Sequence, residues 1–284
     1  MVSQKRFVPE TFWTDLCQGN QHVTKQARNL VREPGMKHEV TEDDIINFAN
    51  QLELEAKESE VSDQTKTELR QKSVFLFREA LSNDKHEMLL RRIADIKFIY
   101  PVKIQEDLCN YHQPFASENT TVQIRGSLID GDPKHQDLVW SSTPIIHLPV
   151  YISQKVSQKM KYAGAHKQPP SENVTRNMRN ICQSPCETEQ LIKTRADVFR
   201  RAYAYLQANG FDGQTLCGLP VVLVEKDTVL FKADGVCLSL SHDLDFRPYL
   251  YKISSQDAMY AEFFQKVGVK KEATAEQYCN VLAA

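Results

Sequence analysis

Apolar residues recur at helical spacing through the first hundred residues. Between 45 and 52 they fall on one face of a helix, which the acidic run Glu42–Asp44 opens and Thr41 can cap. The same spacing predicts helices over 69–81 and 88–96. Shorter helices are predicted around Phe12–Leu16 and over Val23–Arg32.

From Pro101 onward the pattern changes to short alternating or apolar segments separated by turn residues. The helical part is expected to end at Pro101, because the residue before a proline is pushed toward an extended conformation. Glu225–Asp227 separates two apolar runs and predicts a hairpin. Strands are predicted over 121–125, 138–140, 144–150, 219–224, 228–232, 236–240 and 249–253.

The second part also contains amphipathic helices. Its strongest local signal is Ser184–Glu187, where the serine can cap, the proline suits the first helical position and the glutamate follows three residues after the cap. The helix that follows carries a broad apolar face and is expected to end at Asn209-Gly210. Other helices are predicted over 156–162, from Ser254 through Phe264, and from Thr274 onward.

These patterns predict an α+β fold with an N-terminal helical lobe, 1–100, and a mixed lobe, 101–284, of short β-strands or hairpins and amphipathic helices. The 284 residues are 41% hydrophobic and 25% charged, which is ordinary for a globular protein. A chain of this length buries roughly three quarters of its unfolded surface, so it needs no disulfide or metal to fold. No internal repeat is visible, which argues against a solenoid.

The net charge, the length of the apolar runs and the cysteine count argue against several classes of protein. The net charge of −2 excludes strong non-specific attraction to nucleic acid. No apolar run is long enough for a membrane span, and the first residues lack the apolar core of a signal peptide, so a secreted protein is not expected. The seven cysteines are odd in number and widely scattered, which favours reduced thiols over a disulfide framework.

Motifs for cofactors, metals and nucleophilic catalysis are incomplete. Neither GxGxxG nor GxxxxGK[ST] occurs, so Asp130–Asp132 is interpreted as a turn and not as a nucleotide contact. His86-Glu87 begins like a zinc-protease helix but meets Leu90 where the second histidine is needed. Ser241–Asp243 contains triad residue types, yet neighbours on a strand point to opposite faces. The two ligand pairs of a structural zinc are not supplied by Cys182 with Cys186 or Cys237 with His242.

We therefore predict a chain that is not an enzyme, with no catalytic, cofactor-binding or metal-binding residue. Two sets of side chains remain as candidates for binding. Basic side chains lie on predicted helix faces, and a nucleic-acid contact through the helix after Ser184 is an alternative reading: Arg91, Arg92, Lys193, Arg195, Arg200 and Arg201. Arg200 and Arg201 follow an apolar stripe and are interpreted as its solvated margin. Aromatic side chains could anchor a protein interface, although core packing accounts for most of them: Trp140, Tyr203, Tyr205, Tyr249 and Tyr251.

Whole segments of the chain, strongest from Phe75 onward, carry a resemblance to a known family. They are Asp132–His135, Leu138–Ser142, Asn180–Ser184, Cys186–Thr188, Val198–Arg200, Ala202–Leu206, Gly218–Glu225, Phe246–Tyr251, Phe263-Phe264, Val267–Val269 and Gln277-Tyr278. In these segments the chain resembles the sacsin family, whose members are strings of large repeats. Each repeat begins with a region similar to the ATPase domain of the ninety-kilodalton heat-shock chaperones.

The resemblance to the sacsin family implies which part of such a repeat this chain represents. This chain has neither the acidic-plus-asparagine helix nor the DxGxG loop of such an ATPase, so it is expected to lie downstream of that region, as one continuous module of a much larger protein. The implied role is a scaffold in protein quality control and intermediate-filament organisation, in the cytoplasm and partly at mitochondria. The implied partners are chaperone clients, heat-shock chaperones, intermediate-filament proteins and other repeat segments of the same chain. The alternative is a degenerate nucleotide-binding or regulatory lobe for the neighbouring ATPase-like domain, which binding of ATP would reveal.

Overall fold

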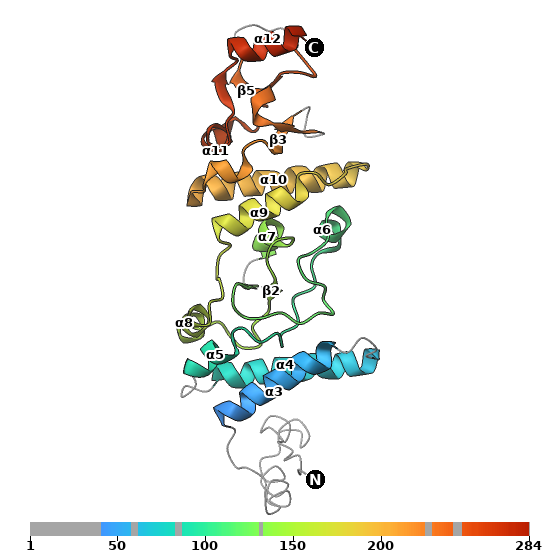
Figure 1. The fold of residues 1–284 in the computed structure, drawn as a ribbon, viewed down its shortest axis with the longest axis vertical. Helices are drawn as coiled ribbons and strands as arrows, with labels where there is room; N and C mark the ends of the chain where they lie inside the picture. The colour runs from blue at the N-terminus through green and yellow to red at the C-terminus, as the bar shows by residue number, and fades with distance from the viewer. Residues whose placement is uncertain are drawn as a thin grey trace, which may run out of the picture. The chain divides into compact units, whose positions relative to one another are not determined.

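The fold combines helices with small two- and three-stranded sheets (Figure 1). The computed structural model describes residues 41–57, 62–82, 87–130, 133–224, 229–240 and 246–283. The chain divides into two compact units, 1–48 and 49–284. The α+β class is confirmed, whereas the predicted lobe boundary at residue 100 stays a prediction. Four predicted features lie outside the described residues: the helices before residue 33, the glycine turn after Asp130, the hairpin turn and Ser241–Asp243.

The capping signal at Thr41 operates as the sequence predicts. Helix α3 (Glu42–Lys57) begins directly after it. The backbone N–H of Asp44 donates to Thr41 Oγ1 at 3.3 Å, and Thr41 donates back to Asp44 Oδ2 from its backbone N–H and its hydroxyl, at 3.1 and 2.7 Å. This reciprocal pair occupies N–H groups that a helix start otherwise leaves without partners.

Three predicted helices are confirmed at α4 (Asp63–Ser82), α5 (Glu87–Ile93) and α8 (Gln154–Tyr162), and α5 packs on both of the others. The ammonium of Lys159 on α8 is buried and donates to the Leu81 carbonyl at 2.8 Å. A cation there suits the last turn of α4, where carbonyl groups carry partial negative charge.

The segment between α5 and α8 contains little regular strand. Strand β1 (Leu128–Ile129) pairs in parallel with β2 (Ile145–Ile146). The strand predicted over 121–125 is wrong, because only Val122 forms a bridge, to Ile99. The strand predicted over 144–150 is confirmed only for the two residues of β2. Helix α6 (Glu106–Tyr111) was not predicted.

The strand predicted over 138–140 is a helix. A 3₁₀ turn, η2 (Pro133–His135), leads into α7 (Gln136–Val139), and Trp140 follows as its C-cap. All four residues of α7 and Trp140 are buried. A short apolar run that is buried on every side shows no periodicity that distinguishes a helix from a strand. This segment forms a helix.

Helix α10 (Glu189–Asn209) starts later in the chain than the predicted cap at Ser184 implied. Its N-cap is Thr188, whose hydroxyl accepts from the Leu191 N–H at 3.3 Å. The Ser184 hydroxyl instead hydrogen-bonds the His112 ring, with 2.9 Å between Oγ and Nδ1. The predicted end at Asn209-Gly210 is confirmed, and Gly210 has a φ of 75° that favours glycine.

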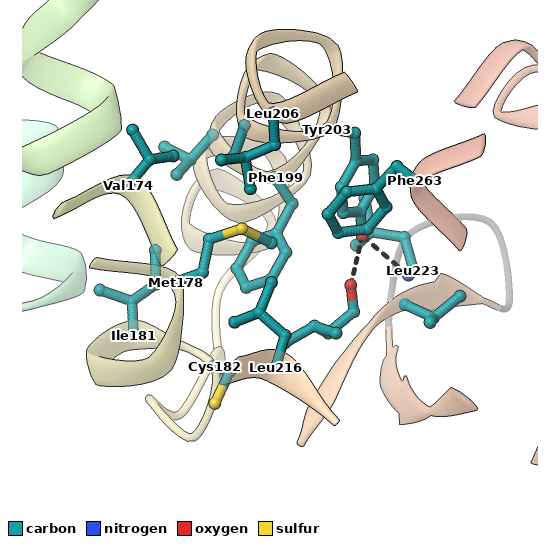
Figure 2. Packing of buried hydrophobic residues seen from close by; sticks show 14 of the residues in the cluster. Val174, Met178, Ile181, Cys182, Phe199, Tyr203, Leu206, Leu216, Leu223 and Phe263 are labelled. Atoms are coloured by element: carbon teal, nitrogen blue, oxygen red, sulfur yellow. Dashed lines mark hydrogen bonds between the residues drawn. The ribbon is translucent and has the colours of Figure 1, made fainter. Parts of the chain in front are cut away.

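Helices α9 (Ser171–Ile181) and α10 lie side by side and supply much of the main core (Figures 1 and 2). Figure 2 shows Val174, Met178 and Ile181 of α9 facing Phe199 and Leu206 of α10. Tyr203 lies at the centre, and Figure 2 marks its two hydrogen bonds to the strand that follows.

The described residues after α10 form two small sheets, two short helices and several 3₁₀ turns. Strand β3 (Pro220–Val224) and β4 (Val229–Lys232) form the predicted antiparallel hairpin. In the second sheet β5 (Val236–Ser239) lies between β6 (Tyr251–Lys252) and β7 (Lys270–Glu272), and all pairs are parallel. The 3₁₀ turns are η3 (Gly213–Leu216), η4 (Ala233–Gly235) and η5 (Ala258–Tyr260), and the helices are α11 (Ala261–Lys266) and α12 (Ala275–Ala283).

Candidate protein-binding groove

A groove of about 880 Å³ lies against α4. Its other walls are the segment 99–103, which precedes α6, and the segment 147–152, which follows β2, with Glu118 and Asp130 also lining it. The lining is mostly apolar, and three of its side chains are buried: Phe77 of α4, Ile99 and Leu148. Small-molecule sites have volumes of roughly 300–1,000 Å³, so the groove is large enough to hold several side chains.

Apolar side chains stand exposed along this groove. Tyr151 is 88% exposed, Val74 is 49% exposed and Ile152 is 36% exposed, and all three line the hollow. A single exposed apolar residue is ordinary, whereas a group of them around a hollow is typical of an interaction site. The groove therefore presents surface that a partner could remove from water.

Two side chains of α4, seven residues apart on one face of the helix, hold this wall in place. Phe77 packs edge-to-face on Phe98 with 6.2 Å between ring centroids. The guanidinium of Arg70 lies 5.6 Å from the centroid of the Tyr100 ring, and its Nη2 donates to the Glu118 carbonyl at 2.9 Å and to Asn119 Oδ1 at 3.1 Å. Burial, opposed by the nearby Arg70 charge, raises the pKa of Tyr100, so its ring stays neutral.

Comparison with known proteins adds one relative. The chain matches human sacsin with 25% identity over 312 aligned residues, which cover the whole of this chain. The chain is similar to sacsin. It spans 7% of the length of that relative, so the match is with one segment of a far larger protein. No family model matches the chain, and no solved structure matches it.

The segments on which the resemblance to sacsin rested form much of the buried core. Trp140 is 1% exposed and donates from its indole to the His112 carbonyl at 3.1 Å. Next to it, Ser141 donates from its hydroxyl and its backbone N–H to the side-chain oxygen of Asn177, at 2.6 and 3.0 Å. A polar contact from one of these segments, just after α7, thus reaches α9.

The aromatic candidates divide as the sequence indicated, with most of them in the core. Trp140, Tyr203 and Tyr251 are buried. Tyr205 is half-buried and its hydroxyl donates to the Pro169 carbonyl at 2.7 Å. Only Tyr249 of this set is largely exposed, and it does not line the groove.

Of the basic candidates on α10, Lys193 and Arg201 are exposed, as a solvated margin requires, whereas Arg200 is half-buried. Arg200 forms two hydrogen bonds to the buried carboxylate of Asp257, and Arg201 pairs with the buried Asp137. Arg195 is itself buried. The correction has a physical reason, because a long arginine side chain can pass along an apolar face and still reach a partner that sequence spacing does not reveal.

The sequence reasoning missed the groove residues themselves. One signal was present in the predicted helix over 69–81, where Val74 lies on a face with Arg70 and Arg78 at the margin of the buried stripe. Among the described residues, no group of three or more histidine, cysteine or acidic side chains is placed to hold a metal. No helix in the described part of the chain is both long and apolar enough to span a bilayer.

Thiol reactivity is expected to follow burial. Desolvation raises the pKa of Cys182 and Cys237, whereas Cys217 and Cys279 are exposed. Because the thiolate is the reactive form, iodoacetamide at neutral pH should modify Cys217 and Cys279 at least about tenfold faster than the buried pair. Peptide mass spectrometry over a time course measures each rate, and labelling of Cys182 as fast as that of Cys217 would contradict the burial.

Proposed function

We propose that this chain is a non-catalytic protein-interaction module that acts within a larger, sacsin-like scaffold. The observation that carries the proposal is the groove along α4, with its exposed apolar side chains. Partner proteins bind most strongly where aromatic and aliphatic side chains fill a hollow and exclude water. The similarity to a 7% segment of sacsin supports a module that works alongside others in one chain.

The wider role we propose follows the resemblance to sacsin. In it the module contributes to protein quality control and to intermediate-filament organisation in the cytoplasm, with unfolded or partly folded proteins among its partners. Extended segments of such proteins expose apolar side chains that folded proteins bury, and these are the side chains that an apolar groove can take up.

Charged substitutions in the groove are expected to abolish binding of an unfolded protein. The double variant Val74→Asp with Tyr151→Asp should bind reduced, carboxymethylated α-lactalbumin at least about tenfold more weakly than the original chain, since two carboxylates then meet apolar side chains. Fluorescence anisotropy of the labelled polypeptide measures both affinities. Both positions are exposed, so the melting temperature should change little.

A matched control uses exposed apolar residues outside the groove. Met259 is 69% exposed and Leu282 is 87% exposed, so the double variant Met259→Asp with Leu282→Asp introduces the same charge. It should bind the polypeptide like the original chain. Equal affinities for the groove variant, the control variant and the original chain would refute the proposal, as would absence of binding to the original chain.

A further inference from the structure

The α4 wall of the groove carries two cations with an apolar side chain between them. Arg70, Val74 and Arg78 are spaced four residues apart and all line the groove, so they form one face of the helix. At ~1.5 Å of rise per residue, the two arginines are about 12 Å apart along the axis. The residues of α4 that line the groove include no carboxylate.

The two arginines differ in how firmly they are held. Arg70 is fixed by the Tyr100 ring and by its hydrogen bonds to Glu118 and Asn119, but its guanidinium has five N–H donors and retains capacity for a ligand. Arg78 is exposed. An ordered guanidinium and an exposed one can both bind carboxylates, and a planar fork binds them better than an ammonium group does.

The rest of the lining sets the charge balance. Lys103 and His147 lie in the other walls and are exposed, and the carboxylates of Glu118 and Asp130 come from the loops that complete the groove. Glu118 lies next to Arg70, which binds its backbone carbonyl, whereas α4 itself supplies two cations and no carboxylate to the lining, with the apolar Val74 between them. The wall complements a ligand that is acidic at two points and apolar between them.

We infer that the groove binds an extended peptide segment of a partner protein in which two acidic residues, four positions apart, flank apolar side chains. In an extended chain four residues span about 13 Å, close to the separation of the two arginines along α4. The apolar side chains then cover Val74 and Tyr151 while the peptide carboxylates meet Arg70 and Arg78. This assignment rests on the proposed function and adds the chemical class of the partner.

Synthetic peptides test the assignment directly. A labelled eight-residue peptide carries aspartate at its second and sixth positions with leucine and valine between them, and matched peptides carry asparagine or lysine there. Fluorescence anisotropy should show the aspartate peptide binding the original chain at least about fivefold tighter than the asparagine peptide, with the difference decreasing as salt screens the charges.

A charge reversal on the protein supplies the decisive comparison. Arg78→Glu should remove the preference for aspartate and favour the lysine peptide, because the sign of the interaction at one end of the groove is reversed. Lys271→Glu makes the same charge change on the exposed strand β7, outside the groove, and should behave like the original chain. Arg70 is left intact because its contacts hold the wall together.

The outcomes separate this inference from the proposed function. If aspartate and asparagine peptides bind equally and the groove variant loses both, the groove binds proteins and the charge assignment is wrong. If neither the peptides nor the unfolded polypeptide bind the original chain, both proposals are wrong. Dimerisation that Tyr151→Asp abolishes in sedimentation velocity would assign the groove to a second copy of the chain and overturn the peptide inference.

Discussion

Replacing Tyr203 with alanine is expected to lower the free energy of unfolding by about 4 kcal/mol, because a buried aromatic ring leaves a cavity that its neighbours fill only in part. The Tyr203 ring is fully buried, and its centroid lies 4.6 Å from that of Phe263 and 5.1 Å from that of Phe264. The ring thus joins α10 to α11 at the centre of the core (Figure 2). Urea unfolding followed by circular dichroism measures the loss.

Tyr203→Phe separates the ring from its hydroxyl. The hydroxyl donates to the Val221 carbonyl at 2.6 Å and accepts from the Leu223 N–H at 3.2 Å, so it binds β3 through two backbone groups. Its removal should cost about 1–3 kcal/mol, since both groups are buried. The matched control is Tyr249→Ala at a largely exposed tyrosine, which should change stability by less than about 0.5 kcal/mol. Similar losses at Tyr203 and Tyr249 would contradict the packing described here.

The sequence predicted a helix end correctly where the helix has its own capping residue and buries only one face. The start of α3 follows from Thr41 and Asp44, and the end of α10 follows from Gly210, because each depends on residues within one turn. The hairpin of β3 and β4 is also local, since its strands are neighbours in the chain. Such features need no knowledge of the rest of the fold.

Elements that depend on distant partners were not predictable in this way. Helix α9 buries Thr175 and Asn177 beside its apolar residues, and Asn177 is satisfied by Ser141, 36 residues earlier in the chain. Threonine and asparagine favour turns over helix interiors, so the sequence alone indicates a loop where their tertiary partners are unknown. The cap predicted at Ser184 failed for the same reason, because the Ser184 hydroxyl binds the distant His112 ring and Thr188 caps α10 instead.

The groove could be predicted least of all, because its walls come from separate parts of the chain. Residue 70 of α4 and residue 152 after β2 are brought together only when the intervening segments fold. Val74 alone is an unremarkable apolar residue on a polar helix face, and Tyr151 alone is a tyrosine after a proline turn. Only the groove that both residues line identifies them as parts of a candidate binding surface.

Replacing Asp257 with alanine is expected to lower the free energy of unfolding by about 3 kcal/mol, because it leaves a half-buried arginine without its carboxylate. Arg200 donates to Asp257 from Nε at 2.7 Å and from Nη2 at 3.3 Å, and Ser254 donates to the same carboxylate at 2.9 Å. The side chain of Asp257 is 1% exposed and that of Arg200 is 17% exposed, so solvent screens the pair little. This pair joins α10 to the turn before α11, which is why its effect should reach the whole fold.

The geometry-matched control for this pair is Asp95→Ala. Arg125 donates to Asp95 through the same two-pronged arrangement, at 2.6 and 3.2 Å, but both side chains are about half exposed or more. Water and salt screen an exposed pair, so the urea midpoint should hardly move for Asp95→Ala while it falls clearly for Asp257→Ala. Equal shifts in the two variants would mean that burial does not govern the strength of these pairs. A shift only for Asp257 would identify the contact between α10 and the C-terminal segment as the one on which the core depends.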